Sequence, residues 1–314
     1  MTPHLAGTAA ILFAAIVWGT TGTAATFAPG VGAAAVGAAA MGLGGLAQAV
    51  LALGGIRRHR SALRDQRRLL IAGALAVAMY PLAFYASMRL AGVTIGTVVT
   101  IGSAPLLSAL LEYRLDRAPL TKRWMAGALV GLAGMVLICG AEGDGTGGPS
   151  VPLGVALGLL GGLTYALYSW TARGMMLRGV PSAVAMGATF GLGGFLLMPV
   201  LAVTGGAFLA SWTNAAVGVY MAAVPMFLGY VAFGYGLARV RASMATTLTL
   251  LEPVVAALLA VVVVGERLPP LGWLGVALVV GCLVIVTMPT PLRREPGRQV
   301  RRPGTLFSRS ARRR

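Results

Sequence analysis

Long apolar runs alternate with short polar junctions along almost the whole chain. A run of about 20 apolar residues crosses the hydrocarbon core of a bilayer as an α-helix. The pattern predicts an all-α membrane protein with ten transmembrane helices, at residues 5–28, 30–54, 69–88, 93–112, 124–141, 152–173, 182–204, 216–237, 242–264 and 270–289. The composition agrees, because 57% hydrophobic residues and a mean hydropathy of +0.84 are too apolar for a soluble domain of this size.

The basic residues fall almost entirely on one side of the predicted membrane. They occupy the junctions after the second, fourth, sixth and eighth helices and the C-terminal stretch from Arg293 to Arg314. Only Arg89 and Arg267 lie elsewhere. Cytoplasmic loops carry an excess of Lys and Arg, so both termini are predicted to be cytosolic. High Ala, Gly and Arg usage is typical of a GC-rich bacterial genome, so we expect a multi-pass protein of the bacterial cytoplasmic membrane.

The two halves of the chain resemble each other. Three markers recur at nearly constant spacing: Pro105 as Pro253, Asp116-Arg117 as Glu266-Arg267, and Trp124 as Trp273. Five helices per half is an odd number, so the second half must enter the membrane in the opposite sense to the first. We therefore predict two inverted five-helix repeats, residues 1–147 and 148–290, an architecture common among secondary transporters.

The net charge of +17 does not indicate a nucleic-acid partner, because Arg-rich cytosolic loops account for it. Residues 291–314 are basic and rich in proline, and they contain almost no hydrophobic cluster. We expect this tail to be a disordered cytosolic segment able to touch anionic lipid headgroups of the bilayer.

The sequence resembles the EamA-type branch of the drug/metabolite transporter superfamily. The resemblance covers helices 1–10 and rests on the duplicated plan, on Val17-Trp18-Gly19, and on the stretch from Glu252-Pro253 through Gly265-Glu266-Arg267 to Trp273. It implies export of a small metabolite or drug-like solute through a central cavity. Two positions depart from the family pattern: Leu115-Asp116-Arg117 replaces a common Gly-Glu-Arg, and Met41 lies near a common membrane-embedded Arg.

Glu252 is the one acidic residue that falls well inside a predicted span. A carboxylate at membrane depth is unfavourable unless it faces a cavity, pairs or takes up a proton. Three interpretations stay open: coupling of transport to protons, a structural hydrogen bond beside the Pro253 kink, and direct contact with a polar group of the substrate.

Other residues within the spans are candidates for the substrate site. Trp18, Tyr80, Tyr165 and Tyr230 lie deep enough to form a pocket for an apolar or amphipathic solute. Hydroxyl groups are available from Thr100, Ser103 and Thr249, although a hydroxyl in a span often bonds its own backbone. Proline bends a helix, so the repeat-related Pro105 and Pro253 are candidate hinges.

Catalytic motifs are missing from the sequence. It has no Gly-rich phosphate loop ending in Lys-Ser/Thr and no Gly-x-Ser-x-Gly elbow, and both His4 and His59 lie outside the spans. We therefore expect a non-enzyme without a cofactor or metal site, with a small molecule as substrate and protons as a candidate coupling ion. The alternatives are an uptake carrier, a lipid scramblase or a scaffold on the same fold.

Overall fold

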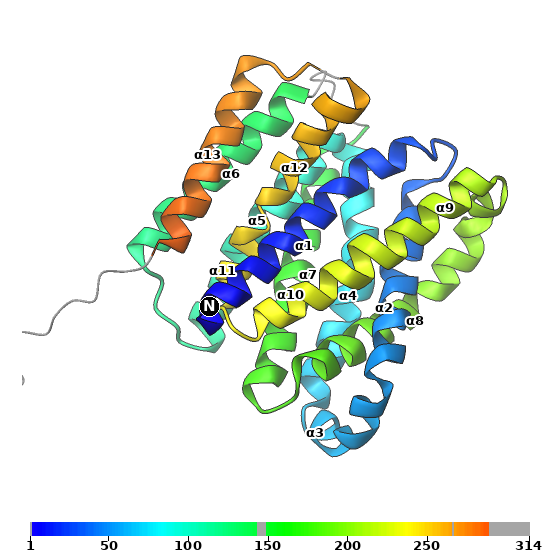
Figure 1. The fold of residues 1–314 in the computed structure, drawn as a ribbon, viewed down its shortest axis with the longest axis vertical. Helices are drawn as coiled ribbons and strands as arrows, with labels where there is room; N and C mark the ends of the chain where they lie inside the picture. Colours follow the sequence, from blue (N-terminus) through cyan, green and yellow to red (C-terminus); the bar gives the residue numbers. More distant parts are fainter. Residues whose placement is uncertain (1, 143–148, 266, 289–314) are drawn as a thin grey trace, which may run out of the picture.

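The computed structural model describes residues 2–142, 149–265 and 267–288, and every regular element in these ranges is helical (Figure 1). In these ranges ten helical segments are long and apolar enough to cross a membrane. The predicted number of spans is confirmed, and their ends differ from the predicted ends by five residues or fewer. The predicted tail at 291–314 and the predicted boundaries at 147 and 290 lie outside the described residues.

The first half of the chain supplies five spans and one short helix. Its elements are α1 (Pro3–Thr26), α2 (Ala33–Arg58), α3 (Arg60–Asp65), α4 (Arg67–Ala91), α5 (Val93–Leu115) and α6 (Lys122–Glu142). Helix α3 was not predicted, because its six residues lie in the polar junction between the second and third spans.

The second half supplies five further spans, two of which are interrupted. Its elements are α7 (Val151–Leu177), α8 (Ser182–Thr204), η1 (Gly205–Leu209), α9 (Trp212–Met221), η2 (Ala222–Leu228), α10 (Gly229–Leu237), α11 (Ala242–Leu248), α12 (Leu251–Leu259), η3 (Ala260–Val264) and α13 (Pro270–Thr287). The eighth span is α9, η2 and α10, and its π-helical middle contains Pro225. The ninth span is α11, α12 and η3.

The ninth span is broken between α11 and α12, where the sequence predicted one continuous helix. Pro253 has no N–H to donate to the carbonyl of Thr249, which instead accepts a hydrogen bond from the backbone of Glu252 at 2.9 Å. The repeat-related Pro105 lies inside the continuous helix α5. Only one of the two equivalent prolines therefore coincides with a helix break.

Helices of one half pack mainly on helices of the other half. Helix α2 packs along α8, and α6 packs along α13, so equivalent spans face each other (Figure 1). Helix α4, the third span, packs on α7, the sixth span. Helix α1, the first span, packs in the same way on α10 and η2 of the eighth span, so the two contacts are equivalent when the halves are exchanged. Two repeats related by a two-fold axis produce this pattern of exchanged partners.

The two halves run in opposite senses. Glycines at the start of α1 and the end of α10 lie together, since a Cβ on Gly236 would be 2.7 Å from the carbonyl oxygen of Gly7. The end of α7 lies at the same place, because Arg173 donates to the carbonyl of Leu237 at 2.6 Å. Helix α1 therefore begins where α7 ends. We call the end of the bundle where α1 begins and α7 ends the Arg-rich end. It also contains the α2–α4, α5–α6 and α10–α11 junctions.

The α2–α8 contact is close because it is built from glycines. A Cβ on Gly45 would lie 2.3 Å from the carbonyl oxygen of Phe190, and one on Gly194 would lie 2.6 Å from that of Gly42. Small residues let helix backbones approach closely within a membrane. These glycines fix the distance between equivalent helices of the two repeats.

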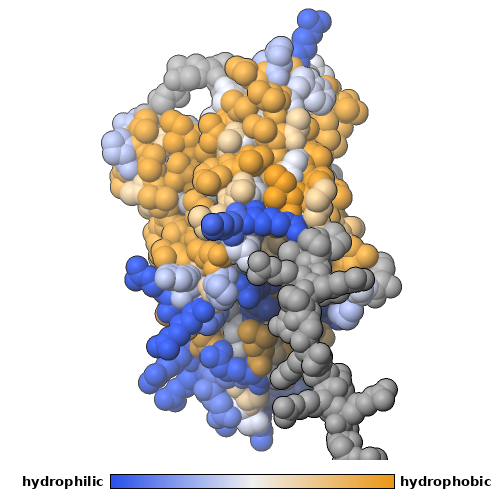
Figure 2. Space-filling model, turned by 90° about the vertical axis from the view of Figure 1, so that its left-hand side faces the viewer, coloured by the Kyte–Doolittle hydropathy of each residue, from blue (hydrophilic) through white to orange (hydrophobic). Residues whose placement is uncertain are grey.

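The outer surface is largely apolar. Figure 2 shows one face on which hydrophobic residues cover the upper part and hydrophilic residues gather over the lower part. Large apolar side chains such as Phe195, Val203 and Leu129 are exposed on the helices. An apolar girdle of this kind is compatible with surrounding lipid, so the fold is that of a multi-pass membrane protein.

Candidate functional site

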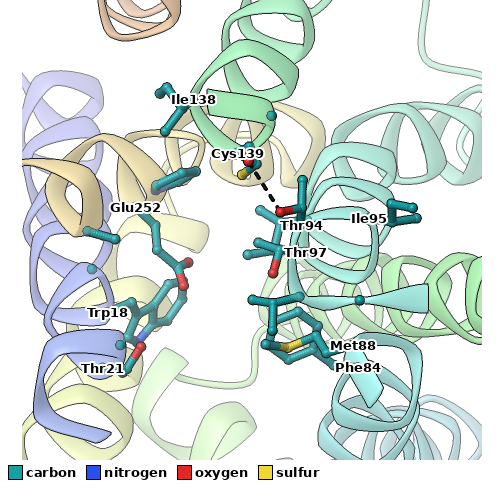
Figure 3. Close-up of a pocket in the computed structure, with 18 of the residues that line it drawn as sticks. Trp18, Thr21, Phe84, Met88, Thr94, Ile95, Thr97, Ile138, Cys139 and Glu252 are labelled. Atoms are coloured by element: carbon teal, nitrogen blue, oxygen red, sulfur yellow. Dashed lines mark hydrogen bonds between the residues drawn. The ribbon is translucent and has the colours of Figure 1, made fainter. Parts of the chain in front are cut away.

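A cavity of about 740 Å³ opens beside the α4–α5 turn, at the end of the bundle opposite the Arg-rich end. Helices α1 and α12 form one wall, and α4, α5 and α6 form the other (Figure 3). Its described lining is Trp18, Gly19, Thr21, Gly22, Phe84, Met88, Ala91, Gly92, Val93, Thr94, Ile95, Thr97, Ile101, Ile138, Cys139, Gly140, Glu252, Pro253 and Ala256. The volume is in the usual range for a small-molecule pocket.

Glu252 carries the charge of the cavity. Among the described residues of the lining, it is the only one with a charged side chain. It lies in the first turn of α12, directly after the break that separates α12 from α11. Its carboxylate extends into the cavity beside Trp18 and Thr21 (Figure 3).

The facing wall is apolar with scattered hydroxyl groups. Phe84 and Met88 come from the end of α4, and Thr94 and Thr97 come from the start of α5. The two helices meet at Gly92, whose φ of 95° lies in the region that favours glycine. Thr94 donates to the carbonyl of Cys139 at 3.3 Å, which ties α5 to α6.

A cluster of aromatic rings forms the base of the cavity. Trp18 is 4% exposed, and its ring centroid lies 4.6 Å from that of Tyr230 and 5.4 Å from that of Phe233. Its indole N–H donates to the carbonyl of Pro225 at 2.8 Å. Phe233 is one turn from Leu237 in the same buried cluster, so the cluster extends from the cavity toward the Arg-rich end.

Two hydroxyl pairs hold this cluster together. The hydroxyls of Tyr168 and Tyr230 lie 2.7 Å apart, and those of Tyr165 and Thr249 lie 2.9 Å apart. These pairs join α7 to α10 and to the turn between α11 and α12. Buried hydrogen-bonded hydroxyls satisfy their polar groups within the apolar base.

The predicted aromatic residues come together, but they occupy different places. Trp18 lies on the cavity wall, whereas Tyr165 and Tyr230 are buried in the base. Tyr80 is partly buried against the same base, and its ring stacks on that of Phe84 with centroids 5.9 Å apart.

The predicted hydroxyl residues lie behind the cavity wall. Thr249 bonds Tyr165, and Ser103 donates to the carbonyl of Thr100 at 3.3 Å. The Thr100 hydroxyl is buried and has no hydrogen-bond partner among the described residues. Of the two candidate hinges, Pro253 lines the cavity and Pro105 is buried within α5.

Sequence reasoning missed most of the facing wall. Phe84, Met88 and Cys139 lie near helix ends, where apolar residues are indistinguishable in sequence from those that face lipid. The sequence feature that could have indicated this wall was Gly92, which joins two predicted spans without a polar loop. Within the described residues, no three His, Cys, Asp or Glu side chains gather in a group suited to a metal ion.

The Arg-rich end is closed by polar contacts between the two halves. Glu112, at the end of α5, is 3% exposed, and its carboxylate accepts hydrogen bonds from the backbone N–H and the hydroxyl of Ser243 at 3.4 and 2.5 Å. It also accepts one from the N–H of Ala242 at 2.7 Å. Further bonds run from Trp170 to Asp116 at 2.8 Å, from Trp124 to Thr247 at 3.0 Å and from Arg241 to the carbonyl of Pro119 at 3.3 Å.

A bundle of ten spans with a cavity at one end and a seal at the other defines a polytopic membrane protein of the transporter class. The pattern of the EamA-like transporter family matches residues 5–140 and again residues 152–288. The chain belongs to the EamA-like transporter family. Membership of this family indicates a transporter rather than an enzyme, and it implies a small-molecule substrate.

Individual relatives agree with this assignment. The chain is 32% identical over 280 residues to the uncharacterized transporter YwfM of Bacillus subtilis, covering 89% of this chain and 93% of the relative. It is 28% identical over 250 residues to a probable terminal-alkyne amino-acid exporter of Streptantibioticus cattleyicolor, covering 78% and 82%. A protein of known crystal structure superposes with a TM-score of 0.71 at 23% identity, covering 90% of this chain and 96% of the other, which supports the fold.

Proposed function

We propose that this protein exports a small metabolite or drug-like solute from the cytosol, by alternating access of the cavity to the two sides of the cytoplasmic membrane. The observation that carries the proposal is the contrast between the two ends. The cavity opens beside the α4–α5 turn, while at the Arg-rich end the Glu112 carboxylate accepts hydrogen bonds that join the first repeat to the second. Inverted repeats support this mechanism, because exchanging the conformations of the two halves converts a state open to one side into a state open to the other side.

The orientation is inferred from the distribution of charge, and the direction of transport from a relative. By the positive-inside rule the Arg-rich end faces the cytosol, so both termini are cytosolic and the cavity faces outward. The name of the Streptantibioticus relative, a probable exporter, supports transport out of the cell.

Protons are the proposed coupling ion. Glu252 is the only charged residue in the described cavity lining, so it is the group there that can exchange a proton with the outer side. A carboxylate that is protonated in one state and ionised in another links the conformation to a proton gradient.

Flux from sealed vesicles tests the proposal. Vesicles are loaded with a small-molecule extract, and the solutes released under a pH gradient of either sign are compared with those released from protein-free vesicles. Gly22→Trp is the blocking variant, because Gly22 lines the cavity and an added Cβ there meets no atom within 4 Å. Gly281→Trp is its matched control, since Gly281 in α13 is equally unobstructed and does not line the cavity.

The expected result is release of a restricted set of solutes by the wild type and by Gly281→Trp, and none by Gly22→Trp. Inward transport under both gradients would indicate an uptake carrier. Exchange of labelled lipid between leaflets without solute release would indicate a scramblase. If the folded protein shows neither activity, a scaffold becomes the supported interpretation.

A further inference from the structure

We propose that the solute carries a protonated amine, which pairs with the Glu252 carboxylate while an apolar, preferably aromatic, body lies against Trp18 and Phe84. This inference rests on the proposed transport function, because it names the chemical class of solute for the same cavity. Four features of the described cavity support it: the charge of its lining, the direction of the carboxylate, the surrounding apolar groups, and the lack of symmetry between the repeats.

The charge of the lining selects for a cation. The described lining holds one carboxylate and no Lys, Arg or His. Arg89 and Arg267, which are exposed, do not line it. Taking a carboxylate out of water is unfavourable unless an opposite charge or hydrogen-bond donors compensate it. A solute ammonium supplies both, whereas an anionic solute would add a second negative charge to the same space.

The direction of the carboxylate favours contact with a solute over a structural role. A structural Glu would point into a helix interface and bond a neighbouring helix, as Glu112 does with Ala242 and Ser243. Glu252 instead points into the cavity, and the only hydrogen bond among the residues drawn in Figure 3 joins Thr94 to Cys139. Since none of the described side chains or backbone groups drawn there donates to Glu252, solvent, a proton or a bound solute can supply its donors.

The surroundings of the carboxylate suit the rest of an amphipathic amine. The indole of Trp18 lies beside the carboxylate and is held in place by its bond to the Pro225 carbonyl (Figure 3). An ammonium group over an aromatic face gains a cation–π interaction. Across the cavity Phe84 and Met88 offer apolar surface, and the Thr97 hydroxyl offers a polar contact.

The carboxylate is also specific to one repeat. In the alignment that superposes Pro105 on Pro253, the position of Glu252 is occupied in the first repeat by Ala104, which is fully buried. The two repeats therefore place different side chains at this position, and the cavity receives a single carboxylate, from the second repeat.

Three probes of similar shape test the charge preference: phenethylamine, which is cationic, phenethyl alcohol, which is neutral, and hydrocinnamate, which is anionic. Binding is measured as the ligand-dependent rise in the unfolding temperature of the purified full-length protein, because a ligand of the native state stabilises it. We expect the amine to bind at least about tenfold more tightly than the alcohol, as a charge-assisted hydrogen bond implies, and the anion to give no stabilisation.

Two variants assign the preference to Glu252. Glu252→Gln should reduce amine binding to the level of the alcohol while leaving alcohol binding within about twofold. Asp65→Asn removes one negative charge from exposed α3, outside the cavity, and should keep the full preference. Equal binding of amine and alcohol by the wild type, tighter binding of the anion, no binding of the amine at millimolar concentration, or an amine preference that survives Glu252→Gln would each overturn the proposal.

The vesicle measurement separates this inference from the proposed function. Release of a restricted solute set that contains no amines would leave the transport function standing and overturn the substrate class. Amine binding that depends on Glu252, without any release in the vesicle assay, would support the substrate class and contradict the transport function.

Discussion

The carboxylate of Glu112 accepts a hydrogen bond from the hydroxyl of Ser243 at 2.5 Å, across the junction of the two repeats. The corresponding pair in the other repeat is missing. With Pro105 aligned to Pro253, Glu112 corresponds to Ala260 and Ser243 corresponds to Ile95, neither of which can form this bond. The repeats are also joined at the cavity end, where Ser87 donates to the carbonyl of Gly154 at 2.7 Å, but no carboxylate takes part there. The charge-assisted latch is therefore confined to the Arg-rich end, which gives a physical reason why that end is the closed one.

Removing the latch should shift the equilibrium toward the state open at the Arg-rich end. Glu112→Gln keeps the shape but replaces charge-assisted bonds with neutral ones, which weakens them by about 1–2 kcal/mol. We expect a cysteine at buried Ala245 in α11 to react faster with an impermeant maleimide, and one at Thr97 on the cavity wall to react more slowly. Cys139 and Cys282 are replaced beforehand.

Opposite changes at the two sites distinguish a latch from general loosening, which would speed both reactions. Asp65→Asn serves as the charge control and should alter neither rate. Unchanged labelling at both sites in Glu112→Gln would show that the latch does not bias the conformation.

The orientation of the chain can be checked with reporter fusions. Fusions after residues 60, 120 and 178 should all report the cytosol, because they lie at the Arg-rich end, and a fusion after residue 208 should report the outside. The decisive position is 120, in the α5–α6 junction. An external signal there would refute the inverted arrangement in the membrane.

Substitution of Gly45 should disrupt the contact between α2 and α8. A Cβ at this position would lie 2.3 Å from the backbone oxygen of Phe190, which cannot move aside as a side-chain tip could. We expect Gly45→Ala to lower stability by about 1–3 kcal/mol, measured as a lower unfolding temperature in detergent. Gly54→Ala in the same helix meets no atom within 4 Å and should be neutral or slightly stabilising. Equal stability of the two variants would contradict the close packing.

Amine binding should weaken as the pH falls, because protonation of Glu252 removes the negative charge that pairs with the ammonium. The probe itself stays protonated as the pH falls, and the phenols of Tyr80 and Tyr165 near Glu252 are neutral from the start, so neither changes its charge. The stabilisation by phenethylamine should therefore decline toward acidic pH in the wild type and stay flat in Glu252→Gln. A decline of equal size in the Gln variant would assign the titration to another group.

The sequence by itself determined the spans, the duplication and the opposite sense of the halves. Each of these depends on a periodic or repeated pattern, such as the recurrence of Pro105 as Pro253, that survives along the chain without reference to neighbours. It also singled out Glu252, since a charge within an apolar run is visible in one dimension.

Only the tertiary structure decided which residues face the cavity. Trp18 and Tyr230 look alike in sequence as deep aromatic residues, yet one lies on the wall and the other is buried in the base. The same holds for Glu112, which lies at a span end in sequence but bonds a helix that begins 130 residues later. In a membrane nearly every helical face is apolar, so hydrophobic patterning does not distinguish lipid from cavity; the distinction comes from packing between helices that are distant in sequence.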